Sequence, residues 1–217
     1  MALKPLKIAL TGGIACGKSL FAKFLRELGV QILDADDIVH ELIPAEERRR
    51  QASIVFADPV ARKALEARIH PLVKDRIERW FKEEADARDF RCSSAEGDVA
   101  DSRESSPSRT SSSFAHSQET SESQAIRVVI IPLLFECKWD ADYDIIICIS
   151  SPVEEQIRRM VETRGLSRAA AEARLSAQLP VPEKAARSHY VIVNDSTVEH
   201  LREEAVRCVE WLRSRQS

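Results

Sequence analysis

The chain has 217 residues, of which 44% are hydrophobic and 31% charged, and its 32 basic and 35 acidic side chains leave a net charge of −3. This near balance excludes a polycation, so nucleic acid is not an expected partner. The longest apolar run, Val128–Phe135, is interrupted by Pro132 and falls far short of the ~20 residues that a membrane-spanning helix needs, so no membrane partner is expected either.

The first elements of the chain alternate between strand and helix. An apolar run at 6–10 predicts a short strand, and apolar residues with helical spacing at 20–28 predict a helix that Gly29 would terminate. Residues 30–33 predict a second strand, which is followed by three aspartates within four positions. Of these aspartates, we expect Asp37 to cap the next helix.

The middle of the chain predicts a helix and then a low-complexity segment. Asp58 followed by Pro59 is typical of a helix start, and Pro71 is expected to end that helix or to kink it. Residues 92–124 contain twelve serines and few apolar side chains, too few to offset the entropy cost of ordering the segment. We therefore predict a flexible insertion between two structured parts.

The last part of the chain returns to strands and helices. Runs rich in β-branched residues at 128–131, 145–149 and 190–193 predict strands that are covered on both faces. Capping boxes at Ser151–Glu154 and Ser196–Glu199 predict the starts of two helices. The alternation of the two kinds of element predicts an α/β fold, with a parallel sheet between two layers of helices.

The turn after the first predicted strand carries a phosphate-binding signature. Residues 12–19 read GGIACGKS, which matches the pattern G-x-x-x-x-G-K-S. In such a loop, backbone amides and the start of the next helix face one anion, while Lys18 reaches the β- and γ-phosphates and the Ser19 hydroxyl coordinates Mg²⁺. A glycine-rich turn that contains Lys-Ser by chance is the alternative, but the flanking strand and helix favour binding of ATP with Mg²⁺.

A phosphate loop does not by itself define a reaction. The NKxD and DxxG motifs of GTPases and the LSGGQ motif of transport ATPases are absent from the sequence. A small-molecule kinase needs a carboxylate near the acceptor hydroxyl, and Asp34 and Asp36 stand at the carboxyl end of the second strand, where open α/β sheets bind ligands. One could accept the proton, for which we favour Asp36, while the other orients Mg²⁺ through water; the alternative is that they only cap a helix.

Such a kinase also needs arginines around the transferred phosphoryl group. Five arginines lie between residues 158 and 174, and a helix interruption at Gly165 with a restart at Ser167 predicts a helix–turn–helix lid. A lid of this kind would exclude water from the phosphates. Any one of these arginines could simply line an exposed helix, and Arg159 and Arg164 are the favoured candidates.

The five cysteines are scattered and form no CxxC pair, which predicts reduced thiols and a cytoplasmic location. Cys16 lies within the phosphate loop beside Lys18, at the start of a helix, where a thiol is expected to ionise readily. Selective alkylation that ATP prevents would follow. The alternative is that Cys16 is a small buried residue.

Taken together, these motifs resemble the dephospho-coenzyme A kinase family. The likeness covers the chain except for the serine-rich insertion, and it is carried in order by TGGIACGKS, LGVQILDADDIVHEL, IVFADPVARKALEARIHPLV, PLLFE, EEQIRRMVETRGLS and ARLSAQLPVPEKAARSHYVIVND. It implies that MgATP phosphorylates the 3′-hydroxyl of dephospho-CoA, the last step of CoA synthesis. The expected partner is this small molecule, and the expected state is a monomer or a weak homo-oligomer.

The resemblance also implies an architecture. Residues 1–217 would form a single domain of the P-loop kinase, adenylate-kinase-like type, with a core at 1–36 and 127–217 and a five-stranded parallel sheet of order 2-3-1-4-5. A helical acceptor-binding subdomain would occupy 37–91, and a lid would span about 156–180.

By the same likeness, Asp36 is the general base, and Lys18 with Arg159 or Arg164 stabilises the phosphoryl group. Asn194 would contact adenine. The implied nucleotide contacts are Gly12, Gly13, Ala15, Cys16, Gly17, Lys18, Ser19, Leu20 and Asn194. The implied acceptor contacts are Asp34, His70, Pro132, Leu133, Leu134, Glu136, Gln178 and Lys184.

The chain departs from the family pattern within the loop and beside it. Ala15 replaces a glycine, so the loop must adopt a conformation that tolerates a Cβ atom. Ile130 leaves no acid in the strand before Pro132, so Mg²⁺ would depend on Ser19, phosphate oxygens and water-mediated carboxylates. Two alternatives stay open: a related kinase that acts on a nucleoside or a sugar, and a nucleotide-binding protein that has lost catalysis.

Overall fold

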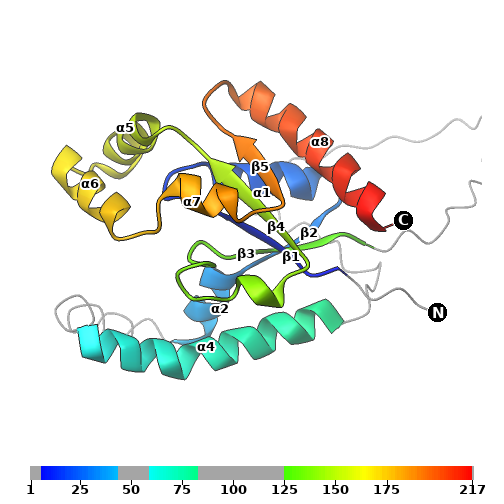
Figure 1. The fold of residues 1–217 in the computed structure, drawn as a ribbon, viewed down its shortest axis with the longest axis horizontal. Helices are drawn as coiled ribbons and strands as arrows, with labels where there is room; N and C mark the ends of the chain where they lie inside the picture. Colours follow the sequence, from blue (N-terminus) through cyan, green and yellow to red (C-terminus); the bar gives the residue numbers. More distant parts are fainter. Residues whose placement is uncertain (1–5, 44–58, 83–124, 217) are drawn as a thin grey trace, which may run out of the picture. The chain divides into compact units, whose positions relative to one another are not determined.

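The computed structural model describes residues 6–43, 59–82 and 125–216. Strands and helices alternate along these ranges (Figure 1). In chain order the elements are β1 (Ile8–Gly12), α1 (Lys18–Glu27), β2 (Gln31–Asp34), α2 (Ala35–Leu42), α4 (Pro59–Lys82), β3 (Arg127–Ile130), the 3₁₀ turn η1 (Asp140–Asp142), β4 (Ile145–Ser150), α5 (Val153–Arg164), α6 (Arg168–Ser176), α7 (Val181–Ala186), β5 (Tyr190–Val193) and α8 (Val198–Gln216). The predicted cap Asp58 and the predicted insertion at 92–124 lie outside the described residues.

The five strands form one parallel sheet in the order β2-β3-β1-β4-β5, which confirms the predicted order. β1 lies at the centre, where Ile8 pairs with Val128 of β3 and with Ile145 of β4. Because all strands are parallel, their carboxyl ends meet at one edge of the sheet. The turn after β1 and the aspartates that follow β2 therefore lie at the same edge.

Two apolar clusters cover the two faces of this sheet. Successive side chains of a strand point to opposite faces, so Ile8 and Leu10 pack with α1 and α8, whereas Ala9 packs with α2 and α4. Figure 1 shows these two pairs of helices on opposite sides of the strands. The arrangement confirms the predicted sandwich of three layers.

Helix α4 runs without a break from Pro59 to Lys82. Of the two predicted effects of Pro71, an end of the helix or a kink, the first is therefore wrong. A proline inside a helix costs about 3 kcal/mol, because it removes one backbone hydrogen bond. Apolar side chains on both sides of Pro71, from Ile69 to Phe81, are buried in the cluster that α4 shares with the sheet. Each buried side chain of this size contributes about 1.5–3 kcal/mol, which outweighs the loss.

Two helix starts differ from the predicted capping boxes. The Ser151 hydroxyl does not cap α5 but donates a hydrogen bond to the carbonyl oxygen of Asn194, 2.5 Å away at the end of β5. Helix α8 is capped by Thr197, one residue later than predicted, whose hydroxyl accepts from the amide of His200. Ser167 caps α6 as predicted. The Ser151 hydroxyl therefore bonds to a residue that follows the neighbouring strand β5 and not to an amide in the first turn of α5.

Strand β5 is not covered on both faces, contrary to prediction. It lies at the edge of the sheet and pairs with β4 alone. Val191 and Val193 are 41% and 48% exposed, whereas Ile192 between them is buried. A run of β-branched residues is thus compatible with an edge strand that is half-covered. The buried strands β3 and β4 follow the expected pattern.

Candidate active site

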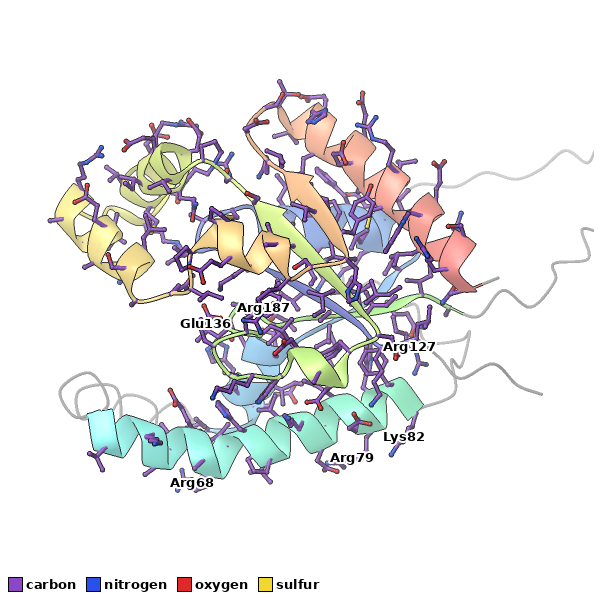
Figure 2. The ribbon with its side chains drawn as sticks, viewed as in Figure 1. Arg68, Arg79, Lys82, Arg127, Glu136 and Arg187 are labelled. Carbon is purple, nitrogen blue, oxygen red and sulfur yellow. The ribbon has the colours of Figure 1, made fainter. Side chains whose placement is uncertain are left out.

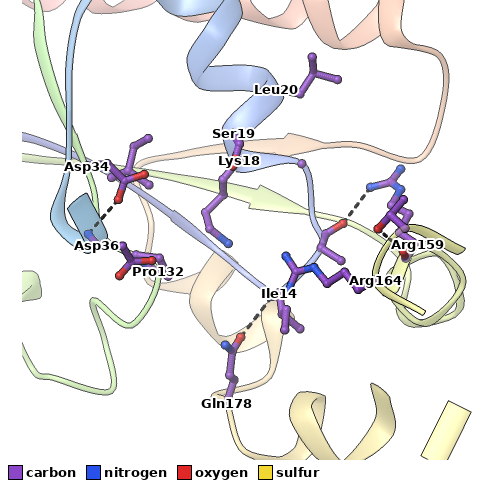
Figure 3. A pocket seen from close by; sticks show the side chains of 14 residues that line it. Ile14, Lys18, Ser19, Leu20, Asp34, Asp36, Pro132, Arg159, Arg164 and Gln178 are labelled. Atoms are coloured by element: carbon purple, nitrogen blue, oxygen red, sulfur yellow. Dashed lines mark hydrogen bonds between the residues drawn. The ribbon is translucent and has the colours of Figure 1, made fainter. Parts of the chain in front are cut away.

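A cavity of about 670 Å³ opens at the carboxyl edge of the sheet. Figure 3 shows that its walls come from separate parts of the chain: the turn after β1, the start of α2, the segment after β3, the end of α5 and the segment before α7. Its lining residues are Ile14, Ala15, Gly17, Lys18, Ser19, Leu20, Asp34, Asp36, Ile130, Pro132, Arg159, Thr163, Arg164 and Gln178. The strand order brings these segments together, since β3 lies between β1 and β2.

Two glycines with positive φ, one at each end of the turn after β1, allow the chain to curl there. Gly12 has φ 142°, and a Cβ atom there would lie 2.2 Å from the carbonyl oxygen of Ile149. Gly17 has φ 95°, and a Cβ atom there would lie 2.3 Å from the side-chain nitrogen of Asn194. Gly17 is also the N-cap residue of α1, so the helix begins directly after the curled turn. This is the geometry that a phosphate-binding loop requires.

Lys18 folds back over this loop. Its Nζ atom donates to the carbonyl oxygens of Gly12 and Gly13, at 3.0 and 2.7 Å. Burial lowers the pKa of the Lys18 ammonium; Cys16 acts in the opposite direction, and the positive charge of Lys184 acts in the same direction as burial. The ammonium group is thus held at the inner wall of the cavity, beside the loop amides.

Ala15 adopts the left-handed conformation, with φ 57°, which few residues other than glycine adopt. We expect Ala15→Gly to raise the free energy of unfolding by about 1 kcal/mol, because the contact between Cβ and the backbone is relieved. Gly29→Ala is the matched control: Gly29 has φ 84° and open space around it, so this change should lower stability by a similar amount. Urea denaturation measures both, and a destabilised Ala15→Gly variant would contradict the assignment of strain.

Cys16 is fully buried in the loop, and burial raises the pKa of its thiol even though Lys18 acts in the opposite direction. The prediction of a readily ionised thiol is therefore wrong, and the alternative of a small buried residue holds. The loss of solvation on burial outweighs the nearby positive charge.

Iodoacetamide is expected to leave Cys16 unlabelled at pH 7.5 in the folded protein, with or without ATP, and to label it fully in urea. Half-buried Cys137 serves as the internal comparison and should react first. Peptide mass spectrometry follows both sites. Labelling of Cys16 ahead of Cys137, or protection that appears only with ATP, would contradict this expectation.

The two carboxylates at the start of α2 have different roles. Asp34, rather than the predicted Asp37, caps the helix by accepting a hydrogen bond of 2.9 Å from the amide of Asp36. Burial raises the pKa of Asp34, although the hydrogen bond from Asp36 acts against it. The Asp36 side chain is exposed at the cavity and has no hydrogen-bond partner in the described ranges. Both aspartates line the cavity, and only Asp36 has an uncommitted carboxylate.

The two candidate arginines also differ. Arg159 donates to the carbonyl oxygens of Ala15 (3.2 Å) and Asn194 (3.1 Å) and to the hydroxyl of Ser151 (3.2 Å). Its guanidinium group is therefore engaged in holding the loop. Arg164 is exposed at the last turn of α5, and within the described part of the chain no hydrogen bond or ion pair engages its guanidinium (Figure 3).

Asn194 binds the phosphate loop on the side away from the cavity. Its side-chain nitrogen donates 2.9 Å to the carbonyl oxygen of Cys16, and the residue is only 7% exposed. It does not line the cavity. The adenine contact therefore stays a prediction, while a contact with the loop is what the structure shows.

The implied acceptor residues are only partly brought together. Pro132 and Gln178 line the cavity with Asp34, and the Gln178 side-chain oxygen accepts from the amide of Ile14 at 3.2 Å. The others lie away from the cavity wall: His70 packs against Trp139 with ring centres 4.9 Å apart, Leu134 is in the core, Leu133 is on the surface, and Glu136 pairs with Lys184 behind the cavity.

Sequence reasoning did not single out three lining residues, Ile14, Ile130 and Thr163, as site residues. Ile14 occupies a variable position of the loop motif, and Thr163 stands one residue before Arg164, on a turn of α5 that faces the cavity. Ile14 and Thr163 could have been found through their adjacency to residues of known chemistry, whereas Ile130 was noted only because it leaves the strand without an acid.

Comparison with known proteins decides the family. A family model described as dephospho-CoA kinase matches residues 6–52 and 109–200. The chain belongs to the dephospho-CoA kinase family. Membership makes it an enzyme, an ATP-dependent transferase of coenzyme A synthesis.

Similar dephospho-CoA kinases come from several bacteria. The chain is 32% identical to one from Synechococcus sp. (89% of this chain, 87% of the relative) and 33% identical to one from Geobacter sulfurreducens (89% and 92%). A crystal structure from Thermus thermophilus is 28% identical, with a TM-score of 0.66 over 96% of this chain and 97% of that one. A dephospho-CoA kinase structure from Campylobacter jejuni, 23% identical, has a TM-score of 0.61 over 97% and 98%, and supports the fold.

Proposed function

We propose that the cavity transfers the γ-phosphoryl group of ATP to the 3′-hydroxyl of dephospho-CoA, which gives CoA and ADP. The observation that carries this proposal is the presence in one cavity of a phosphate loop, an uncommitted carboxylate on Asp36 and an uncommitted guanidinium on Arg164. A phosphoryl transfer needs these three groups around the donor, the acceptor and the charge that develops between them.

Different residues would bind ATP, accept the proton and stabilise the transferred phosphoryl group. Amides of the loop and the ammonium of Lys18 would hold the phosphates of ATP. As the acceptor oxygen attacks the γ-phosphorus, its proton passes to the Asp36 carboxylate, and the bond from phosphorus to the β–γ bridging oxygen breaks to release ADP. Arg164 would offset the negative charge on the transferred group. These roles agree with the uncommitted state of Asp36 and Arg164.

Mg²⁺ fits the oxygen atoms at this site. The Ser19 hydroxyl is exposed in the cavity, and the carboxylates of Asp34 and Asp36 lie in the same cavity. Over the described ranges, no group of three or more His, Cys, Asp or Glu gathers as a complete metal cage, and Mg²⁺ usually binds through few protein ligands and keeps several waters. Ser19 would therefore bind the ion, and its chemistry would be to neutralise charge on the phosphates.

The lid and the acceptor subdomain are part of this proposal. Helices α5 and α6 share a small apolar cluster of their own, formed by Ile157, Met160 and Ala171, and the loop residues Ile14 and Ala15 pack against it. This small cluster supports a lid at about 156–180 that moves as a unit over the remainder of the core at 1–36 and 127–217. The acceptor subdomain proposed at 37–91 contains α4 and the part of α2 that follows Asp36.

We also propose that the enzyme is cytoplasmic. The four cysteines in the described ranges are all unpaired, which supports a cytoplasmic enzyme. None of the helices there has the length and apolar content to cross a membrane. We propose a monomer or a weak homo-oligomer, which light scattering behind size exclusion would test.

A coupled assay of ADP release tests the function. We expect turnover with dephospho-CoA and at most traces with AMP, nucleosides or sugars. Turnover with one of the latter at a similar rate would favour a related kinase of another specificity. ATP binding without turnover on any acceptor would show that catalysis has been lost.

A further inference from the structure

The ammonium of Lys184 is buried behind the cavity, where it makes two polar contacts. The side chain is 0% exposed, and Nζ lies 2.6 Å from Oε1 of Glu136 and 3.1 Å from the carbonyl oxygen of Pro132. Burying an ammonium group is unfavourable even when it is paired, and an apolar side chain of similar size would fill the same space without that penalty. Packing alone therefore does not explain why a lysine stands at this position.

Glu136 connects this ammonium to the segment that leads into α7. The same oxygen, Oε1, also accepts a hydrogen bond of 3.0 Å from the amide of Leu179. The second oxygen, Oε2, is buried without a hydrogen-bond partner among the described residues. One carboxylate oxygen thus remains without a hydrogen bond, which lowers the stability that the carboxylate can contribute. The other oxygen connects the turn after β3 to the main chain at Leu179.

The groups held by this pair belong to a residue of the cavity wall, Pro132, and to the direct neighbour of another, Gln178. Lys184 holds the carbonyl of Pro132, and Pro132 lines the cavity on the side of Asp36 (Figure 3). Glu136 holds the amide that directly follows Gln178, whose side-chain oxygen accepts from the amide of Ile14 in the phosphate loop. One ion pair therefore joins the acceptor side of the cavity to the loop that holds ATP.

We propose that Glu136 and Lys184 form a positioning pair that sets the place of Gln178 and Pro132, and that neither touches the acceptor directly. This inference rests on the proposed function, because it concerns how that cavity binds and aligns its acceptor. Figure 2 labels Glu136 and Arg187 in the region between α7 and α2. Arg187 lies over the ring of Phe135, 4.4 Å away, and adds a second contact between the two segments.

The double variant Glu136→Gln/Lys184→Met tests the pair, because it removes both charges without leaving either unpaired. We expect kcat/KM for dephospho-CoA to fall about 10- to 100-fold, the usual effect of a displaced positioning group. Gln178→Ala should lower kcat/KM clearly in the wild type but by less than about threefold in the double variant, because the two changes act through one contact. The control is Lys74→Met/Asp142→Asn, an exposed pair of the same 2.6 Å length.

A readout without turnover separates this inference from the proposed function. The Ile14 amide should exchange with solvent at least about tenfold faster in the double variant than in the wild type, as seen by NMR without substrate. A wild type that does not phosphorylate dephospho-CoA would overturn the function, while the exchange result would still decide the pair.

Unchanged exchange at Ile14, or independent effects of Gln178→Ala and the double variant, would overturn the proposal. If the double variant does not fold, Glu136→Gln alone carries the test, because glutamine keeps an oxygen that faces Lys184 and Leu179. In this single variant, kcat/KM for dephospho-CoA should again fall and the Ile14 amide should again exchange faster, both by less than in the double variant. Unchanged exchange at Ile14 would again overturn the proposal.

Discussion

Replacing Asp36 with asparagine is expected to lower kcat with dephospho-CoA by roughly 10²–10⁴-fold, the usual worth of a positioned general base. Asparagine has nearly the same shape but cannot take the proton of the attacking hydroxyl. The affinity for ATP should stay within about threefold, because the change removes a role in the transition state and not one in nucleotide binding. Steady-state kinetics together with calorimetric titration of ATP measure both quantities.

Asp37→Asn is the matched control for this experiment. Asp37 lies in the same first turn of α2 and is exposed, but it does not line the cavity. Turnover by that variant should match the wild type. If Asp36→Asn retained full turnover, the base would be Asp34, or alignment of the substrates alone would account for the rate.

Arg164→Ala is expected to lower kcat by about 10²–10³-fold with little change in thermal stability, because its guanidinium is exposed at the cavity and uncommitted in the described structure. Arg159→Ala should give the opposite pattern. Its hydrogen bonds to Ala15, Asn194 and Ser151 hold the loop, so its loss should lower the free energy of unfolding by about 1–3 kcal/mol and weaken ATP binding. Denaturation curves and kinetics of the two variants make the comparison.

Two further arginines provide controls: Arg158 on the same helix α5, and Arg168 at the start of α6. Both are exposed, and both are paired with glutamates: Arg158 with Glu155 and Glu162, and Arg168 with Glu154 and Glu172. Exposed pairs of this kind contribute little, so alanine at either position should change neither kcat nor stability appreciably. If Arg159→Ala lowered kcat and Arg164→Ala did not, the assignment of the two arginines would be reversed.

The sequence predicted the layout of the fold and the position of the phosphate loop. Both depend on local patterns: β-branched runs for the strands, and the spacing of Gly12, Gly17 and Lys18 for the loop. The strand order followed from the family resemblance, and the sheet confirms it. Features encoded in consecutive residues were therefore predictable.

Features that depend on a distant partner were not predictable. The Ser151 hydroxyl has a good local target, yet it bonds to Asn194 because the ends of β4 and β5 lie side by side. The Cys16 thiol stands beside a lysine, yet burial decides its pKa. Arg159 and Arg164 look alike in sequence, and only the main-chain oxygens around the first of them distinguish their roles.

The hydrogen bond from the side chain of Asn194 to the carbonyl oxygen of Cys16 joins residues 178 positions apart. The loop is synthesised well before the groups that shape it, which lie on β4, on α5 and directly after β5. Contacts between such distant segments form late and slowly in folding. A nascent chain therefore cannot gain stability from nucleotide before Asn194 has been synthesised, and shortening the chain before β5 should abolish ATP binding even though the entire motif is present.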